Sequence, residues 1–158
     1  LFAQLMQVGG RAGRAELPGR VLIQTDYPDH PLYQAVQQHD YPRYAKTLLQ
    51  DRADALLPPF SFQAMLRADA PDSVTPAMEF LQVATQILPL ADFPQITLYD
   101  PVPMRMTRLA NRERAQLLVE SNSRPALLHF LKAWYTALAT LRQPRTLRWH
   151  IEVDPVEY

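Results

Sequence analysis

Apolar and polar positions follow regular spacings through most of the chain from Phe60 onward. Two stretches, 75–88 and 123–141, carry apolar residues every three or four positions, which is typical of amphipathic helices. Other segments alternate between apolar and polar residues, or form short apolar runs, as β-strands do. The segments with strand spacing are 60–67, 96–99, 114–120 and 147–153.

The predicted order of these elements is β-α-β-β-α-β. This is the split-βαβ pattern of a ferredoxin-like sandwich, in which two helices cover one face of an antiparallel sheet. Right-handed connections make it the least contorted way to bury both apolar helix stripes. We therefore expect residues 60–158 to form an α+β, ferredoxin-like domain, an architecture that on its own predicts no particular function.

The first 59 residues are patterned differently. Residues 1–7 have helical spacing, and a glycine-bearing loop follows them. The apolar run Val21-Leu22-Ile23 predicts a short buried strand over 20–25. This part therefore begins as helix, loop and strand.

Proline at first helical turns, in His30-Pro31 and Tyr41-Pro42, predicts two connecting helices. The pair Pro58-Pro59 ends the second, because a residue that precedes proline is disfavoured in helical conformation. The sequence thus predicts three parts, with boundaries at 1–27, 28–59 and 60–158.

The net charge of zero conceals an asymmetry. Between Glu16 and Asp100 there are eleven acidic and five basic residues, whereas between Met104 and Arg148 there are nine basic and two acidic residues. This excess of positive charge favours a polyanion or an acidic partner for the second half. An ordinary solvated basic surface is the alternative.

Composition argues against several kinds of site. The chain has no cysteine, which excludes disulfides and thiolate-bound metals. No run of about 20 apolar residues suggests a membrane span. The histidines have no ligand spacing, so we expect no metal site. They are His30, His39, His129 and His150.

The segment 7–14 reads QVGGRAGR and places Arg11 and Arg14 three residues apart. A guanidinium group is planar, permanently charged and bidentate toward phosphate oxygens. Across a cleft from a nucleotide, such a group stabilises the transferred phosphoryl group and accelerates hydrolysis by about 10³ to 10⁵. Glycine–arginine repeats also occur in surface loops and in nonspecific nucleic-acid contacts, so the motif alone leaves both interpretations open.

QVGGRAGR resembles motif VI, Q-x-x-G-R-x-x-R, of superfamily 2 helicases, and residues 19–25 resemble the strand that closes their second RecA-like lobe. Further landmarks, in order along the chain, resemble the primosomal protein N′ (PriA) family of replication-restart helicases. They are HPL at 30–32, LPPF at 57–60, PVP at 101–103 and VDPVE at 153–157.

This resemblance implies the C-terminal part of an ATP-dependent 3′-to-5′ DNA helicase of the bacterial cytoplasm and nucleoid. Such an enzyme recognises stalled replication forks and promotes replisome reloading. Residues 1–27 would be the end of the second lobe and residues 28–59 a helical connector. The resemblance gives Arg11 and Arg14 a catalytic role, and it implies a set of nucleotide-binding residues: Gln7, Gly10, Arg11 and Arg14.

Members of the family use ATP with Mg²⁺ and hold zinc in a cysteine-rich module. The sequence has no G-x-x-x-x-G-K-[ST] motif, no D-E-x-H motif and no cysteine. Because the chain also begins at Leu1, within a predicted helix, we expect a piece of a longer protein. By itself it would be inactive and would bind none of these cofactors.

The resemblance also implies binding partners: forked and single-stranded DNA, the acidic C-terminal tail of single-stranded DNA-binding protein, and other primosome proteins. Residues 105–114 resemble the family's basic hairpin loop, although Leu-Ala-Asn replaces a glycine-rich stretch and Glu113 dilutes the charge. The DNA-binding residues that it implies are Arg105, Arg108, Arg112 and Arg114.

Arg124 matches a family position that grips the tail's carboxylate, while the glutamine expected one turn later is Leu128. An exposed residue at a helix start is the alternative interpretation of Arg124. The long predicted helix and the last strand also carry Trp134, Tyr135 and Trp149. These lie on apolar stripes, so we expect them to pack in the core and not to stack on bases.

Two alternatives to the helicase interpretation remain at this point. The chain could be a stand-alone module that binds DNA or a partner tail and has no enzymatic role. It could also be an interaction scaffold that packs against other domains.

Overall fold

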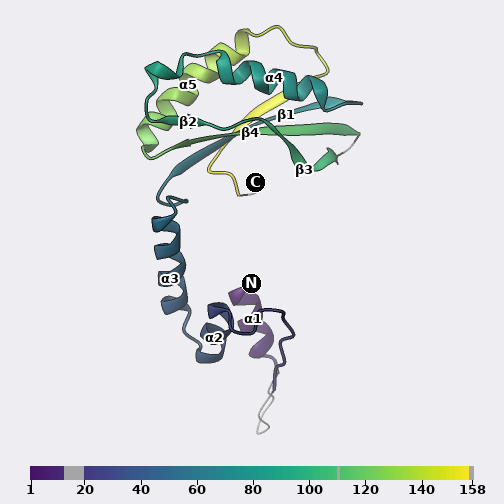
Figure 1. Ribbon diagram of the computed structural model, residues 1–158. Coiled ribbons are helices and arrows are strands. Elements are labelled where there is room, and N and C mark those ends of the chain that lie inside the picture. Colours follow the sequence, from purple (N-terminus) through teal and green to yellow (C-terminus); the bar gives the residue numbers. More distant parts are fainter. Residues whose placement is uncertain (13–19, 110, 157–158) are drawn as a thin grey trace. The chain divides into compact units, whose positions relative to one another are not determined.

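The computed structural model describes residues 1–12, 20–109 and 111–156, with the backbone alone for 105–109. The chain divides into two compact units, Leu1–Ala55 (unit 1) and Leu56–Tyr158 (unit 2) (Figure 1). Each unit is built from residues that are adjacent in sequence.

Unit 1 is helical in the part that the structure describes. Its helices are α1 (Phe2–Gly9), α2 (Pro31–Gln38) and α3 (Tyr41–Asp54). Proline occupies the first turn of both α2 and α3, as predicted. The Nδ1 atom of His30 accepts a hydrogen bond from the Leu32 amide at 3.1 Å, and a carboxylate oxygen of Asp40 accepts one from the Arg43 amide at 3.0 Å. These caps satisfy amides that a helix start leaves without partners.

The strand predicted over 20–25 is wrong. The segment is irregular, and Val21, Leu22 and Ile23 are 42%, 79% and 40% exposed. A strand forms only where a neighbouring strand pairs with its amides and carbonyls, and residues 1–12 and 20–55 contain no other strand. The apolar run therefore lacks a sheet within unit 1.

Unit 2 is an α+β domain, as predicted. Its elements are β1 (Phe62–Pro71), α4 (Thr75–Gln86), η1 (Leu90–Asp92), β2 (Ile96–Leu98), β3 (Val102–Leu109), β4 (Arg112–Ser121), α5 (Arg124–Thr140) and β5 (Arg148–Val153). The strands form one antiparallel sheet in the order β2-β4-β1-β5, with β3 also paired to β4. Helices α4 and α5 lie on the same side of the sheet (Figure 1).

The sheet has one strand more than the sequence predicted. Strand β2 pairs with the C-terminal end of β4, from Ile96 opposite Ser121, whereas β3 pairs with its N-terminal part, from Val102 opposite Gln116. The chain between them passes through the buried Pro101. Two short strands therefore share the edge along β4 that a single strand was expected to fill.

The core of unit 2 lies between the sheet and its two helices. On β1, Ala64 and Leu66 face this core, consistent with the predicted alternation. Trp134 of α5 is fully buried, and its indole Nε1 donates a hydrogen bond to the Ala84 carbonyl of α4 at 2.9 Å. The two helices are thus joined by a polar contact inside an otherwise apolar layer.

Two residues predicted on the buried stripe of α5 are exposed instead, Leu128 at 47% and Tyr135 at 57%. The buried side chains of this helix are Leu127, Phe130, Leu131, Trp134 and Leu138. A step of one residue turns an α-helix by about 100°, so the residues after Leu127 and Trp134 lie on the flank of the stripe.

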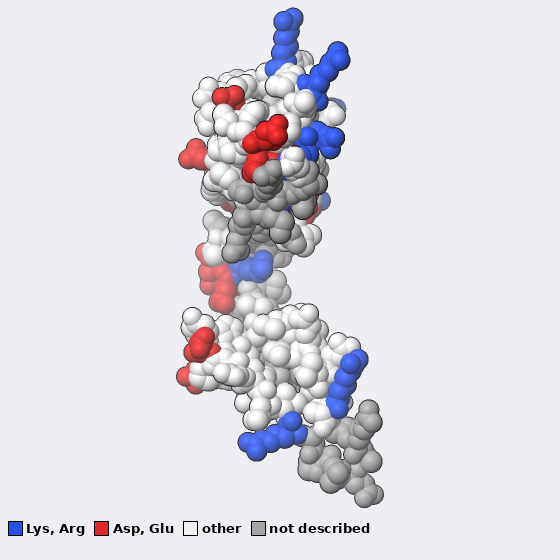
Figure 2. All heavy atoms as spheres, turned by 90° about the vertical axis from the view of Figure 1, so that its right-hand side faces the viewer, with Lys and Arg blue, Asp and Glu red and all other residues white. Residues whose placement is uncertain are grey.

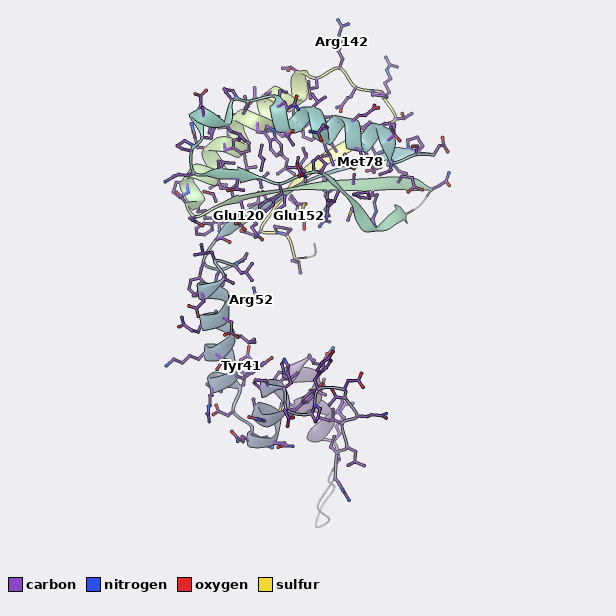
Figure 3. All side chains as sticks on the ribbon, viewed as in Figure 1. Tyr41, Arg52, Met78, Glu120, Arg142 and Glu152 are labelled. Carbon is purple, nitrogen blue, oxygen red and sulfur yellow. The ribbon has the colours of Figure 1, made fainter. Side chains whose placement is uncertain are left out.

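The face of the sheet without helices carries polar pairs. Arg67 and Glu152 form an ion pair at 3.1 Å, and Glu120 accepts hydrogen bonds from Gln63 and from the Tyr99 hydroxyl. Figure 3 shows Glu120 and Glu152 on the side of the sheet away from Met78 of α4. Partial burial, the neighbouring Glu120 carboxylate and the hydrogen bond to it raise the pKa of Tyr99 above its ordinary value.

Candidate nucleic-acid and partner-binding surfaces

The predicted nucleotide motif lies at the end of α1. Gln7 is exposed on the helix, Gly10 caps it with ordinary helical dihedrals, and Arg11 follows in an exposed turn. A Cβ atom at Gly10 would come no closer than 3.5 Å to another heavy atom, so the backbone there is open to approach. Arg14 lies outside the described residues, and the role of the motif in nucleotide binding stays a prediction.

The described residues do not form a metal site or a membrane span. No three histidine, aspartate or glutamate side chains among them come close enough together to hold a metal ion. No helix in the described ranges has the length and apolar character needed to cross a bilayer.

The predicted basic hairpin is present, but it is mostly strand and not loop. Residues 102–109 form β3, and β4 begins at Arg112, where Leu109 pairs with it. Asn111 in the turn has a φ of 61°, a left-handed conformation that asparagine tolerates better than most residues. The loop prediction failed because strand pairing extends nearly to the tip of the hairpin.

The register along this hairpin is irregular. Pro103 lies opposite Ala115, and the next pair, Arg108 with Glu113, is five residues on along β3 but only two along β4. The backbone pairing of β3 with β4 is thus irregular between these two pairs. Arg105 lies within this irregular stretch.

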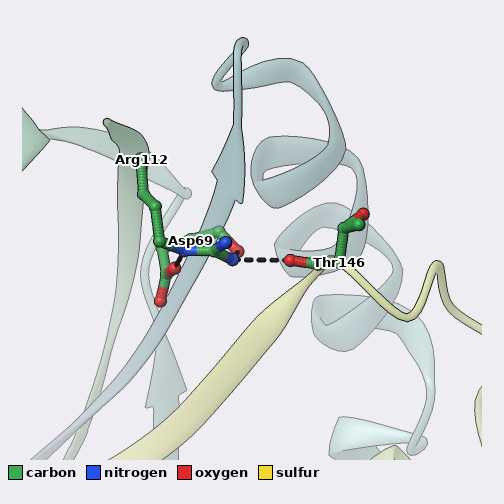
Figure 4. A network of polar contacts seen from close by, with 3 residues as sticks. All are labelled: Asp69, Arg112 and Thr146. Atoms are coloured by element: carbon green, nitrogen blue, oxygen red, sulfur yellow. Dashed lines mark hydrogen bonds and ion pairs between the residues drawn. The ribbon is translucent and has the colours of Figure 1, made fainter. Parts of the chain in front are cut away.

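Arg112 holds three parts of unit 2 together (Figure 4). Its Nε forms an ion pair with the Asp69 carboxylate, and its Nη2 donates to the carbonyls of Asp69 and Thr146. The two paired side chains are only 18% and 23% exposed. This guanidinium thus links β4, β1 and the loop before β5, and these contacts give it a structural role. Its predicted contact with DNA stays untested, as do those of Arg105, Arg108 and Arg114.

Arg124 begins α5 and already holds a carboxylate. Its Nη2 lies 3.0 Å from an Asp154 carboxylate oxygen, and its guanidinium lies 5.8 Å from the centre of the Phe62 ring. The Asp154 amide donates to the Gln63 carbonyl at 2.9 Å, which fixes this aspartate beside the sheet. Asp154 was not among the predicted site residues, although it lies within the VDPVE segment that supported the family resemblance.

A groove of about 520 Å³ runs between α5 and β5, and the sequence did not predict it. It is lined by Leu128, Leu131, Lys132, Tyr135, Trp149, His150, Ile151 and Val153.

Figure 2 shows that lysine and arginine gather toward one edge of the visible face of unit 2, with several acidic side chains away from that edge.

The amino-acid sequence matches a known protein family and several of its members. The family model described as the primosomal protein N C-terminal domain matches residues 53–156. The replication restart protein PriA of Haemophilus influenzae is 38% identical over 158 residues, a match that covers 98% of this chain and 21% of that protein. The same-named protein of Synechocystis is 34% identical and covers 98% of this chain and 18% of its own length.

A more distant relative, the replication restart protein PriA of Bacillus subtilis, is 28% identical and covers 83% of this chain and 16% of its own length. A solved AsnC family transcriptional regulator from Agrobacterium tumefaciens aligns with a TM-score of 0.24 at 12% identity over 99% of this chain and 91% of that one, too weak a likeness to carry an argument. The chain thus spans about a fifth of the length of these curated relatives. On the family model and the relatives together, this chain belongs to the family of the primosomal protein N C-terminal domain.

Proposed function

We propose that this chain is the DNA- and partner-binding end of an ATP-dependent 3′-to-5′ helicase that recognises stalled replication forks and promotes replisome reloading. The observation that carries the proposal is the family match over residues 53–156, which spans nearly all of unit 2. The relatives' name, replication restart protein, supports the same activity. The helicase reaction, its ATP and Mg²⁺, and the zinc module belong to the rest of such a protein.

We also propose that unit 2 is a ferredoxin-like sandwich. The order β5-β1-β4, with β2 and β3 together on the far side of β4, supports this assignment. So does the placement of both helices on one face of the sheet (Figure 1).

Residues 7–14 would supply the arginine side of the ATP site. The residues present fit only that part, because the sequence has neither a Walker lysine nor a D-E-x-H motif. Arg11 is exposed, as a residue that reaches a nucleotide from across a cleft must be. Arg11 and Arg14 would stabilise charge on the phosphoryl group in transfer.

A chimera tests this role. The chain would replace the matching 21% of the Haemophilus influenzae protein, and ATP hydrolysis would be measured with DNA present. Arg11→Ala and Arg14→Ala should each lower hydrolysis by about 10³-fold or more and leave affinity for forked DNA unchanged. Exposed Arg43→Ala, on α3, is the matched control. Hydrolysis at the unsubstituted rate in both variants would refute the assignment.

DNA binding is proposed at the β3–β4 hairpin. Arginines at 105 and 108 on β3 and at 114 on β4 would neutralise phosphates and release counterions. Arg112 contributes indirectly, because its contacts with Asp69 and Thr146 fix the strand that carries Arg114.

Anisotropy titration of a labelled oligonucleotide against the 158-residue chain measures this binding. Replacing Arg105 or Arg108 by alanine should weaken it and lower the slope of log K against log salt by about one each. Arg43→Ala again serves as control. An unchanged salt slope in both variants would place the DNA elsewhere.

A second proposed activity is the binding of an acidic partner tail, that of single-stranded DNA-binding protein, at Arg124. The observation that favours it is the ion pair with Asp154, because a guanidinium that donates to one carboxylate can donate to another. An incoming carboxylate would displace that of Asp154. Arg124→Ala should therefore abolish binding of an acidic peptide with a free C-terminal carboxylate, while Asp154→Asn should strengthen it. Equal affinities in all three proteins would contradict this site.

A further inference from the structure

Tyr135 stands exposed beside a second aromatic ring. Its side chain is 57% exposed, and its ring centre lies 5.4 Å from that of Trp149 with the planes tilted by 58°. Both residues line the groove between α5 and β5, together with Lys132 one turn earlier on the helix. An aromatic ring thus reaches solvent at the wall of an open groove.

The position of Tyr135 is supported from the core outward. Trp149 is half-buried and stacks on Phe80 of α4, with 5.8 Å between ring centres and 30° between planes. Phe80 is 7% exposed and belongs to the core cluster. The rings of Phe80, Trp149 and Tyr135 therefore pack in a row from the core to the surface. Tyr135, the outermost, contacts a ring that is itself held against the core. An aromatic side chain held in this way loses little conformational entropy on binding.

The stretch of sequence that supplies most of the groove's lining is basic, and Lys132 is the lysine that it places in that lining. From Ser121 to Ile151 the sequence contains no aspartate or glutamate, whereas it contains five lysine and arginine residues. These are Arg124, Lys132, Arg142, Arg145 and Arg148. Arg142 projects outward from the loop between α5 and β5 (Figure 3).

The carboxylates that follow this stretch are already paired. Glu152 forms its ion pair with Arg67 at 3.1 Å, and Asp154 forms its pair with Arg124 at 3.0 Å. The lining of the groove contains no aspartate or glutamate, so none of its residues opposes an anion at Lys132.

We propose that the Tyr135–Trp149 groove is a second DNA site, specific for single strands, in which a base stacks on Tyr135 while Lys132 contacts a phosphate. An exposed ring in basic surroundings suits a nucleobase, which offers a flat π-face whatever its identity. In a duplex these faces are covered by neighbouring base pairs, so an unpaired strand is the form that fits. The inference rests on the proposed DNA-binding function but uses none of the hairpin arginines.

The two tryptophans of the chain provide the signal for a test. Trp134 is fully buried, so an added oligothymidylate should quench mainly Trp149. The titration uses the 158-residue chain at low salt. We expect quenching together with a rise in oligonucleotide anisotropy. Tyr135→Ala should weaken binding at least about fivefold, as expected for loss of one stacked base, and Tyr135→Phe should keep the affinity.

Two further variants sharpen the measurement. Lys132→Gln should lower the salt slope by about one. Tyr27→Ala, which removes a tyrosine that is 73% exposed in unit 1, is the matched control and should bind as the unsubstituted chain does. Thermal unfolding of each variant confirms that the fold is retained, since Tyr135 lies outside the core.

The outcomes separate this inference from the proposed function. If Tyr135→Ala binds normally while the Arg105 and Arg108 variants bind weakly, the groove is not a DNA site but the hairpin is. If the unsubstituted chain binds no oligonucleotide at low salt, both fail. If an acidic peptide quenches Trp149 and the oligonucleotide does not, the groove serves a protein partner and this inference is overturned.

Discussion

Units 1 and 2 differ in how far their apolar side chains are buried. In the described part of unit 1 only Leu32 and Ala35 are buried apolar side chains, and a cavity of about 650 Å³ lies among α1, α2 and residues 21–28. In unit 2 both helices and the sheet close over one continuous core. The spacing of apolar residues along a segment thus predicts their burial only where the helices or strands that would cover them belong to the same unit.

The largest expected loss of stability in unit 2 is at Trp134. Trp134→Ala should lower the free energy of unfolding of unit 2 by about 3–5 kcal/mol, because it leaves a cavity and deprives the Ala84 carbonyl of its donor. Urea denaturation followed by circular dichroism measures the loss, and amide exchange resolved by residue locates it. Tyr135→Ala, one position further on, should cost less than about 1 kcal/mol. Faster exchange in unit 1 would show that the two units do not unfold independently.

Arg112 should give the next largest effect. Arg112→Ala removes a partly buried ion pair and two hydrogen bonds, one of them exposed, at a cost of about 1–3 kcal/mol. A double-mutant cycle with Asp69→Asn should recover a coupling energy between the two side chains. Exposed Arg145→Ala is the control. Additive effects of the two substitutions would mean that the pair contributes nothing as a pair.

The pair of Arg124 and Asp154 should contribute less to stability than Arg112 does. Both side chains are 52% exposed, and pairs of this kind contribute about 0–1 kcal/mol. Asp154→Asn keeps a residue that tolerates the φ of 54° found here, so it isolates the loss of charge. Its effect on the unfolding midpoint should disappear at high salt. An effect that persists there would point to the backbone and not to the ion pair.

The smallest effect is expected in unit 1. Leu22 is 79% exposed, so Leu22→Ser should change stability by less than about 0.5 kcal/mol. Leu81→Ala in the core of unit 2 is the comparison, with an expected loss of about 2–5 kcal/mol. Urea denaturation measures both. A large loss at Leu22 would show that residues 20–25 are packed in solution and would remove the contrast between the units.

Local patterns predicted much of unit 2. The alternation over 147–153 matches β5, and Ser123 caps α5 by accepting a hydrogen bond from the Ala126 amide at 3.4 Å. These features depend on neighbours within a few residues, so the sequence displays them directly. The α+β class followed from them.

The remaining features depend on contacts between distant residues. Strand β3 was missed because one proline and two arginines interrupt its apolar positions, and only pairing with β4 makes it a strand. Proline is tolerated there because β3 lies at the edge of the sheet. The contact of Arg124 with Asp154 joins residues thirty positions apart, and no spacing rule connects them. The motif at 7–14 indicated the family, but the structure describes only part of it.

The pairing of β1 has a consequence for synthesis of the protein. Asp69 of this central strand lies opposite Arg114 on one side and Arg148 on the other, so both neighbours follow it late in the chain. During translation β1 therefore emerges long before either partner strand, and the sheet cannot close until residues 148–153 have left the ribosome. Until β5 has been made, β1 lacks one of its two partner strands, and its apolar side chains are incompletely covered.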